Sequence, residues 1–363
     1  MSSTWGSSLK ISIFGESHGL GVGVVLDGLP AGERLDIAAI RAEMERRAPA
    51  VEPNAQRKER EADMPEICSG ILQEYTTGAP LCAVIENAAS HTVDYERLAR
   101  LPRPGHADYT GAVRYNGYND VRGGGHFSGR LTAPLVFAGA VCKQILARRG
   151  VVIGGHILSI GNVYDHAFDP MRVYPERLLD MSRKYLALVN PDCEAPMRKV
   201  IEDAQKDGDS VGGVVEVAAV GVPAGIGTPI FGGIENVLSS IIYGVPAVKG
   251  VEFGAGFNVA RMRGSECNDP FAIEHDKVVT TSNNSGGILG GISTGMPIIV
   301  RAAVKPTPSI PLRQRTVDLK EKRDALLSIN GRHDPCIVPR ALPSVEAAVA
   351  IGIADLMKEA GRL

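Results

Sequence analysis

The hydrophobic residues of this chain gather in short runs that polar and glycine-containing stretches separate. Five of these runs are rich in Val, Ile or Ala and are bounded by turn-forming residues, as β-strands are. We therefore predict strands near residues 22–26, 80–86, 151–160, 214–220 and 298–304.

Four other segments repeat apolar residues every three or four positions, which is the period of one helix face. Asp36 is a suitable N-cap for the first of them. Pro343 lies in the first turn of the last one, and Gly361 follows its end. The pattern predicts helices over residues 36–47, 132–149, 195–206 and 343–360.

Two of the predicted strands continue into similar turns. GVVLDGLPAG at residues 23–32 resembles VVEVAAVGVPAG at residues 214–225, with Pro-Ala-Gly closing both. The similarity indicates either one structural unit used twice or the reuse of a common strand-to-turn sequence. No Ser/Gly tract marks a linker, and strands and helices do not alternate strictly. We therefore predict a single α+β domain over residues 1–363.

The composition is that of a globular protein, with 44% hydrophobic and 22% charged residues. No apolar run reaches the roughly 20 residues that cross a bilayer, and the N-terminus lacks the pattern of a secretory signal. Six scattered cysteines without a CxxC pair disfavour a zinc site or a disulfide framework. A net charge of −2 disfavours general nucleic-acid binding. We expect a cytoplasmic protein.

Two compositional features point to a ligand. Residues 45–60 are locally basic, which indicates either a solvated helix end and loop or a site for an anionic small molecule. Glycine accounts for 42 of 363 residues, whereas roughly 7% is usual. The Gly-Gly pairs form either tight turns or backbone amides that are open to a ligand.

Two histidines lie in segments that are expected to turn. His18 follows Ser17 after an apolar stretch, and a histidine can donate or accept a proton near neutral pH. GESHG does not match G-x-S-x-G, which disfavours a hydrolase nucleophile. His106 shares a proline-stiffened loop with Arg103 and Asp108. A surface turn without function is the competing interpretation of both segments.

Three further segments suit an anion. The glycine-rich run 122–130 leads into a predicted helix, where free N–H groups favour phosphate, but it matches neither a Walker loop nor GxGxxG. Residues 305–309 place a lysine and two hydroxyls on a loop that is either a phosphate site or a rigid strand exit. Residues 331–336 bring Arg, His and Asp together shortly before the last helix. No segment has the ligand spacing of a metal site.

Six blocks of the sequence resemble the successive signature blocks of chorismate synthases, in the family's order, between residues 15 and 347. They are GESHGLGVGVVLDGLPAG, RPGHAD, GGGHFSGRLTAPLVFAGA, AVKGVEFG, NNSGGILGG and GRHDPCIVPRALPSVEA. The resemblance covers nearly the whole chain. It implies a single-domain β-α-β sandwich, with helices packed between two mainly antiparallel sheets, that assembles as a homotetramer.

The resemblance also implies a lyase that converts 5-enolpyruvylshikimate 3-phosphate to chorismate and phosphate by anti-1,4-elimination. This is the last step of the shikimate pathway toward aromatic amino acids. The family requires reduced FMN, although no net redox change occurs. The sequence contains no segment that looks like a reductase module, which favours an external flavin reductase, with NADPH only an indirect source of reduced flavin.

The catalytic residues that the resemblance implies are two histidines, an aspartate and two serines. His18 corresponds to the histidine that protonates the leaving phosphate, and His106 to the one that protonates the reduced flavin. Asp334 corresponds to the carboxylate that assists flavin N5 in removing the ring hydrogen. Ser17 and Ser128 match hydroxyls that relay protons or fix the flavin and the substrate.

The implied binding residues form two overlapping sets. The substrate set is His18, Arg47, Arg57, Arg103 and Arg332. The flavin set is Arg47, His126, Phe127, Ser128, Ala247, Gly290, Lys305, Pro306, Thr307, Pro308, Ser309 and Arg332. Whether Arg47 contacts a nicotinamide nucleotide is open at this point.

The sequence departs from the family pattern in two places. The family block Arg-Ser-Ser-Ala-Arg reads HFSGR at residues 126–130. Because a histidine cannot replace the permanent bidentate contact of an arginine, we hypothesise a pH-dependent flavin affinity, which equal affinity from pH 6 to pH 8 in a flavin titration would contradict. The basic stretch reads RRAPA at residues 46–50, so substrate contacts between residues 48 and 57 are unassigned.

Two other functions are compatible with the residues themselves. A flavin-dependent reductase with net hydride transfer would share the phosphate loop and the histidines, but it would consume reduced flavin stoichiometrically. A non-catalytic sensor of flavin or of a phosphorylated metabolite would release no phosphate, whichever residues occupy positions 18 and 106.

Overall fold

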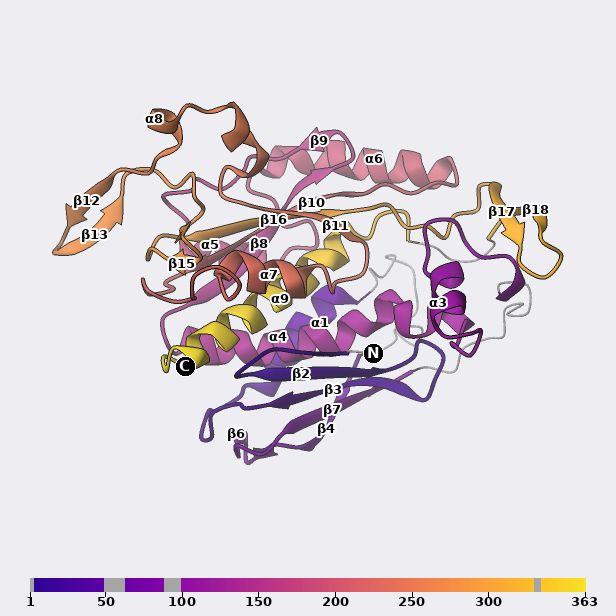
Figure 1. The fold of residues 1–363 in the computed structure, drawn as a ribbon, viewed down its shortest axis with the longest axis horizontal. Helices are drawn as coiled ribbons and strands as arrows, with labels where there is room; N and C mark the ends of the chain where they lie inside the picture. The colour runs from indigo at the N-terminus through magenta and orange to yellow at the C-terminus, as the bar shows by residue number, and fades with distance from the viewer. Residues whose placement is uncertain (1–2, 49–62, 88–98, 330–333) are drawn as a thin grey trace.

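The computed structural model describes residues 3–48, 63–87, 99–329 and 334–363. Two five-stranded antiparallel sheets lie on either side of a layer of helices (Figure 1). In the first sheet the order is β1 (Thr4–Trp5), β2 (Lys10–Gly15), β3 (Gly21–Asp27), β7 (Leu81–Glu86) and β4 (Pro65–Ser69). In the second it is β11 (Val248–Phe253), β16 (Ile298–Val304), β10 (Gly213–Val220), β8 (Val152–Ile160) and β9 (Val163–Tyr164).

The helices between the sheets supply most of the core. They are α1 (Ile37–Arg47), α4 (Thr132–Ala147), α7 (Ile234–Ile242) and α9 (Val338–Glu359). The central pair is α4, which packs on β3 and β7, and α9, which packs on β8 and β10. Nearly every residue of α9 is buried, because both of its faces meet apolar partners. The predicted sandwich of two antiparallel sheets around helices is therefore confirmed.

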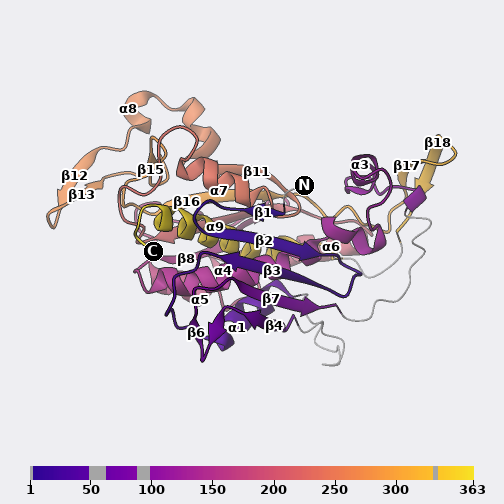
Figure 2. The ribbon, with the colours of Figure 1, turned by 60° about the horizontal axis from the view of Figure 1, so that its bottom comes forward.

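Smaller elements project from this core. The α-helices are α3 (Asp108–Arg114), α5 (Pro175–Met181), α6 (Glu194–Lys206) and α8 (Gly264–Cys267). The two-stranded hairpins are β5 (Ile71–Leu72) with β6 (Tyr75–Thr76), β12 (Phe271–Glu274) with β13 (Lys277–Thr280), β14 (Ile288–Leu289) with β15 (Ile292–Ser293), and β17 (Gln314–Asp318) with β18 (Arg323–Leu327). In both views the β12–β13 hairpin extends from one end of the molecule, while α3 and the β17–β18 hairpin lie at the other (Figures 1 and 2).

The five predicted strands correspond to β3, β7, β8, β10 and β16, each within one residue at either end. Three of the predicted helices are also close to the observed α1, α4 and α6. The carboxylate of Asp36 accepts a hydrogen bond from the Ala39 backbone N–H and caps α1 as predicted. Gly150, with φ of 78°, follows the end of α4, as a glycine C-cap does.

The start of the last helix is a correction. It begins at Val338 rather than at residue 343, so Pro343 lies inside the helix and not in its first turn. Pro339 occupies the first turn instead, where the N–H that proline lacks has no helical partner in any case. Two prolines in VPRALP concealed the helical pattern at the N-terminal end of this helix.

The two sheets repeat one topology. Along the chain, β2, β3, α1, β4, β7 and α4 correspond to β8, β10, α7, β11, β16 and α9, and each strand holds the same place in its sheet. The two similar sequences belong to β3 and β10, the central strands. Gly28 and Gly221 end them with φ of 92° and 86°, and Gly32 and Gly225 repeat the match with 82° and 91°. The sequence similarity therefore reflects one structural unit used twice.

One segment of the described residues, Gly129–Ala147, is long and apolar enough to span a membrane. In this fold 83% of that segment is buried inside the protein, where α4 packs against α9 and the first sheet. Its apolar character is thus accounted for by its position as a core helix.

Candidate functional site

Most of the predicted site residues meet where four loops converge. These are the turn 16–20 between β2 and β3, the loop 101–107 before α3, the glycine-rich run 122–128 and the loop 305–309 after β16. Gly123, Gly124 and Gly125 have φ of 57°, 88° and 52°, a left-handed conformation that glycine adopts far more readily than other residues. The triple glycine thus allows a backbone path that other sequences cannot follow.

The two predicted catalytic histidines lie against neighbouring glycines of this run. A Cβ atom on Gly123 would lie 1.9 Å from His18 Nδ1 and 2.9 Å from Ser17 Oγ. A Cβ atom on Gly124 would lie 3.0 Å from both Cε1 and Nε2 of His106. Because there is no side chain at either glycine, the imidazoles of His18 and His106 reach the same short piece of backbone from different loops. The structure therefore brings Ser17, His18 and His106 together.

His106 belongs to a compact charged group with Arg103 and Asp108. Arg103 donates from Nε and Nη2 to the two carboxylate oxygens of Asp108, each at 2.7 Å. His106 Nδ1 lies 2.6 Å from Asp108 Oδ1, so Nδ1 carries the hydrogen and Nε2 is directed to the Gly124 side. Burial alone would raise the pKa of Asp108, but hydrogen bonds from Arg103 and His106 hold it well below its ordinary value. The ionised carboxylate thus fixes the orientation of the imidazole.

The loop 305–309 adjoins this group and is built to receive an anion. Arg103 Nη1 donates to Ser309 Oγ at 3.3 Å, and Lys305 Nζ would lie 3.9 Å from a Cβ atom on Gly105. Burial lowers the pKa of Lys305, because it disfavours the charged amine. The positive charge of the nearby Lys249 lowers this pKa further. Thr307 Oγ1 is buried and has no hydrogen-bond partner among the described residues.

Two lysines and an unpartnered hydroxyl would all gain from a phosphate group. The residues therefore fit a phosphorylated ligand such as FMN. The backbone N–H of Lys305 also donates to the Ala247 carbonyl at 2.9 Å, which brings the predicted flavin-lining Ala247 beside the same loop.

A second group of charges surrounds Arg47. Its guanidinium is only 3% exposed and contacts Asp63 and the hydroxyl of Thr132, while Arg130 binds the other oxygen of Asp63. Burial lowers the pKa of Arg47 to about 10, although Asp63 opposes the shift. Arg47 and Thr132 line a cavity of about 90 Å³ together with Arg340.

Asp334 lies beside this group rather than against the histidines. Its carboxylate accepts a hydrogen bond from Arg340 at 3.1 Å and one from the Cys336 backbone N–H at 3.3 Å. Arg340 in turn donates to the Arg47 carbonyl at 3.0 Å. Ser128 lies between the two groups along the chain. Its hydroxyl accepts a hydrogen bond from the Arg130 backbone N–H at 3.2 Å and caps the short turn before α4.

Three other predicted flavin contacts have neighbours outside the loop 305–309 in this chain. His126 is exposed, and its ring nitrogens contact the Gly15 carbonyl at 2.8 Å and the Ser3 hydroxyl at 2.9 Å. Phe127 packs on Tyr115, with ring centroids 6.1 Å apart, and lies close to Gly111 in α3. Gly290 lies in the turn between β14 and β15, at the opposite end of the molecule from α3 (Figures 1 and 2). Arg57 and Arg332 fall outside the described residues.

Sequence reasoning missed Asp63, Asn87 and Arg340. Asp63 neutralises Arg47 and Arg130, and Arg340 pairs with Asp334. Asn87 joins Arg130 to the turn that carries His18. Arg340 stands in the last signature block, but nothing in the spacing of Asp63 or Asn87 distinguishes them from ordinary surface residues.

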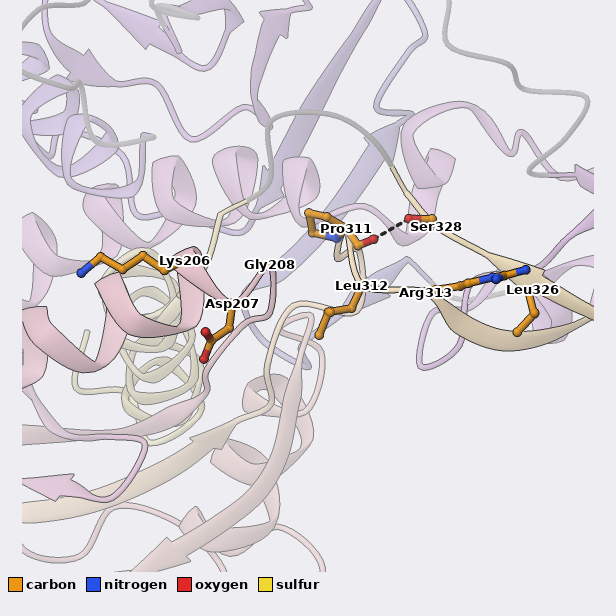
Figure 3. Close-up of a pocket in the computed structure, with 8 residues that line it drawn as sticks. All are labelled: Lys206, Asp207, Gly208, Pro311, Leu312, Arg313, Leu326 and Ser328. Carbon is orange, nitrogen blue, oxygen red and sulfur yellow. Dashed lines mark hydrogen bonds between the residues drawn. The ribbon is translucent and has the colours of Figure 1, made fainter.

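A separate cavity of about 520 Å³ lies between the end of α6 and the β17–β18 hairpin. Figure 3 shows that Lys206 extends away from Leu312 and Arg313, so that the two basic side chains do not converge on a common point. Despite its size, this cavity lacks the histidines and the paired charges. The convergent loops around Gly123 and Gly124 are the better candidate for the active site.

Comparison with known proteins identifies the family of this chain. The family model described as chorismate synthase matches residues 9–357. The chain is 49% identical to the chorismate synthase of Thermococcus kodakarensis over 352 residues, 96% of both chains, and 46% identical to that of Dehalococcoides mccartyi over 99% of this chain and 98% of that one. A crystal structure of chorismate synthase covers 98% of this chain and 93% of its own, with a TM-score of 0.77 and 31% identity. The chain belongs to the chorismate synthase family of lyases.

Proposed function

We propose that this chain converts 5-enolpyruvylshikimate 3-phosphate to chorismate and inorganic phosphate by anti-1,4-elimination, with reduced FMN bound. The observation that carries the proposal is the position of His18 and His106 against adjacent glycines, beside a loop that suits a phosphate group. The C–O bond to phosphate and a ring C–H bond break, a new double bond forms, and no net oxidation occurs. Membership in the family supports this reaction.

His18 is the proton donor to the leaving phosphate in this proposal. An imidazole titrates near neutral pH, so it can supply a proton as the C–O bond breaks and the phosphate gains negative charge. Ser17 Oγ lies on the same side of Gly123 and is placed to relay that proton.

His106 presents Nε2 to the flavin site, because its Nδ1–H donates to Asp108, and in the imidazolium form Nε2 carries the proton that passes to the flavin. Lys305, Thr307 and Ser309 hold the phosphate of FMN, and Ala247 borders the same loop. When bound, reduced FMN supplies electron density to the elimination and is regenerated as the ring hydrogen leaves. Asp334, held by Arg340, is the proposed carboxylate near the departing hydrogen.

The decisive experiment is an anaerobic assay with 5-enolpyruvylshikimate 3-phosphate and chemically reduced FMN, following phosphate and chorismate. We expect many turnovers per reduced flavin, because the flavin is not consumed. One flavin oxidised per product would identify a reductase instead. No phosphate release by folded wild-type protein would overturn the proposal, and release that survives His18→Ala and His106→Ala would overturn the assigned roles.

We further propose that the enzyme works in the cytoplasm and receives reduced FMN from an external flavin reductase, so that NADPH is only an indirect source. The same assay tests this with NADPH and oxidised FMN in place of reduced FMN. Product should form only when a flavin reductase is added. Turnover with NADPH alone would show that the chain reduces its own flavin.

We also propose a homotetramer. The β12–β13 hairpin and its base expose large apolar side chains, with Phe257 85% exposed and Phe271 and Ile273 mostly so. Such a set on a projecting element is typical of a subunit interface. Light scattering after size-exclusion chromatography should give four times the 38.4 kDa chain mass, and Phe257→Asp with Ile273→Asp should lower it. A monomeric wild type would contradict this assembly.

A further inference from the structure

We propose that Asn87 is a positioning residue for His18, a role that rests on the proposed function of His18 as proton donor. Asn87 follows β7 directly, opposite the turn between β2 and β3. Its side-chain amide donates to the carbonyls of Glu16 at 2.9 Å and of Gly19 at 3.0 Å. These two carbonyls flank Ser17 and His18, so a single side chain holds both ends of the turn.

Backbone hydrogen bonds also hold the turn. Gly19 N–H donates to the Glu16 carbonyl at 3.1 Å within the turn, and Ser17 N–H donates to the Gly125 carbonyl at 3.1 Å. The Asn87 backbone adds an N–H bond to the Leu20 carbonyl at 3.2 Å. Leu20 itself is 98% exposed, so apolar packing of this side chain does not fix the turn. Hydrogen bonds from Asn87 therefore join both ends of the turn to the end of β7.

The oxygen of the same amide points to the charged group around Arg47. Asn87 Oδ1 accepts a hydrogen bond from Arg130 Nε at 3.0 Å. Arg130 and Arg47 each bind one oxygen of Asp63, which is 8% exposed. Asn87 thus ties the turn of His18 to a buried arginine pair. This arrangement keeps the proton donor in a fixed position relative to the positive charges that face the cavity near Arg340.

The arrangement requires both the donor and the acceptor of an amide. An aspartate at position 87 would keep the acceptor for Arg130 but would replace the N–H donors with an oxygen facing two carbonyls. An alanine would remove both. Asn87→Asp and Asn87→Ala therefore separate the contact with the turn from the contact with Arg130.

Gln144 provides a matched control. It is half-buried like Asn87, and its amide exchanges two hydrogen bonds with the backbone of Asp36, at 2.8 and 2.9 Å. Gln144→Ala removes an amide clamp of the same kind near the C-terminal end of α4, whereas the residues around His18 adjoin the run before its N-terminal end. It reports what such a loss does to the fold alone.

The test combines steady-state kinetics with hydrogen–deuterium exchange of the full-length enzyme. We expect both Asn87 variants to lower kcat roughly 10- to 100-fold, because displacing a catalytic group by about 1 Å has effects of that order, while KM changes by less than about threefold. Amides of residues 16–20 should exchange faster in both variants. Gln144→Ala should keep the wild-type kcat and the wild-type exchange of this turn.

Each outcome decides the proposal. Wild-type kcat in Asn87→Asp, or an equal loss of kcat in Gln144→Ala, would overturn it. If the wild-type enzyme releases no phosphate, the proposed function fails, and the exchange data alone decide the role of Asn87. Unchanged protection of residues 16–20 in both Asn87 variants would then overturn it, and faster exchange would support it.

Discussion

At the scale of single residues, the site depends on two positions being glycine, where no side chain occupies space. Gly123→Ala would place a methyl group 1.9 Å from the ring of His18 at a φ of 57°, so the imidazole must move. We expect kcat to fall at least about 100-fold, as for other displacements near 1 Å. Steady-state phosphate release measures this effect.

The matched substitution is Gly264→Ala, where a Cβ atom meets nothing within 4 Å and φ lies outside the left-handed region. It should leave kcat unchanged. Gly124→Ala provides a graded comparison, because its Cβ atom would lie 3.0 Å from His106. Full activity in Gly123→Ala would show that His18 does not need its present position.

The carboxylate of Asp108 leads to a second expectation. Its pKa is depressed in the folded protein, so its stabilising effect is present above the unfolded pKa of about 3.9 and is lost as the pH falls through the folded value. Asp108→Asn should therefore lower the melting temperature most at pH 7, and the loss should begin to shrink as the pH falls below the unfolded pKa of about 3.9. It should also reduce kcat, because His106 loses the acceptor that fixes its tautomer.

Calorimetric melts of wild type and Asp108→Asn between pH 3 and pH 7 test this expectation. Asp120→Asn is the comparison on the next loop. Its carboxylate pairs with the exposed Arg122, which lowers the pKa of Asp120 as well, so we expect a smaller loss of the same sign. A difference between wild type and Asp108→Asn that stays constant with pH would contradict the argument.

The residues of the site could be predicted singly from the sequence but not as a group. His18 and His106 are far apart in the chain, and only the fold shows that Gly123 and Gly124 lie against both. Asp63 could not be predicted, because an ion pair across the fold leaves no local pattern. The ring of His126 contacts Gly15 and Ser3, which no sequence pattern indicates, and its contact with flavin stays a prediction.

At the scale of elements, a buried charged group joins three helices of the central layer. Glu346 of α9 is fully buried and accepts hydrogen bonds from Arg46 of α1 and Lys143 of α4. Removing one member of such a group leaves the others charged and unpaired. We expect Glu346→Gln to lower the free energy of unfolding by about 3–5 kcal/mol in urea titrations.

Exposed ion pairs provide the comparison. Glu194→Gln removes the partner of Arg198 on the surface of α6, where about 0–1 kcal/mol is expected. Burial would raise the pKa of Glu346, but Arg46 and Lys143 lower it to about 2. Its contribution should thus persist above about pH 4.5 and fade as the pH falls toward 2. Equal losses in the two variants would contradict the role of this group.

Element boundaries show where sequence patterns are informative. The strands β3, β10 and β16 are buried and rich in β-branched residues, so their runs were recognisable. The sequence pattern places the start of α9 too late, because proline is a common helix boundary. Burial of Val338 and Ala341 stabilises the part of the helix that precedes Pro343. Helix α7 was missed, since nine residues form too short a periodic pattern to stand out.

At the scale of the whole molecule, one structural unit occurs twice, but only the first half holds the two histidines proposed to be catalytic. We propose that residues 1–363 form one domain, because α4 and α9 pack against each other and against both sheets. The halves differ in what covers the sheets. The outer side of β8 is covered by α5. The segment that contains this helix is anchored to the sheet by a row of charged side chains.

This row crosses four strands of the second sheet. His156 on β8, Glu216 on β10, Arg301 on β16 and Glu252 on β11 are paired in register. His156 is fully buried, with Nε2 2.9 Å from Glu216 and Nδ1 3.3 Å from Asp165, and its ring meets Phe168 edge-on at 4.5 Å. Asp165 also accepts the N–H groups of Val189 and Asn190, which fastens both ends of the covering segment to the sheet.

Protonated His156 should therefore stabilise the fold. Burial lowers its pKa, but Asp165 and Glu216 outweigh burial, and the pKa is raised above the ordinary value of about 6.5. A raised pKa in the folded state means that the stabilisation is complete below about pH 6.5 and is lost as the pH rises through the folded value. Wild-type protein should lose stability between pH 6 and pH 9 relative to His156→Gln, in urea titrations at each pH.

His275→Gln, on the exposed turn of the β12–β13 hairpin, should follow wild type. If His156→Gln does not fold, Asp165→Asn tests the same link, and parallel curves in either variant would show that His156 is neutral in the folded protein.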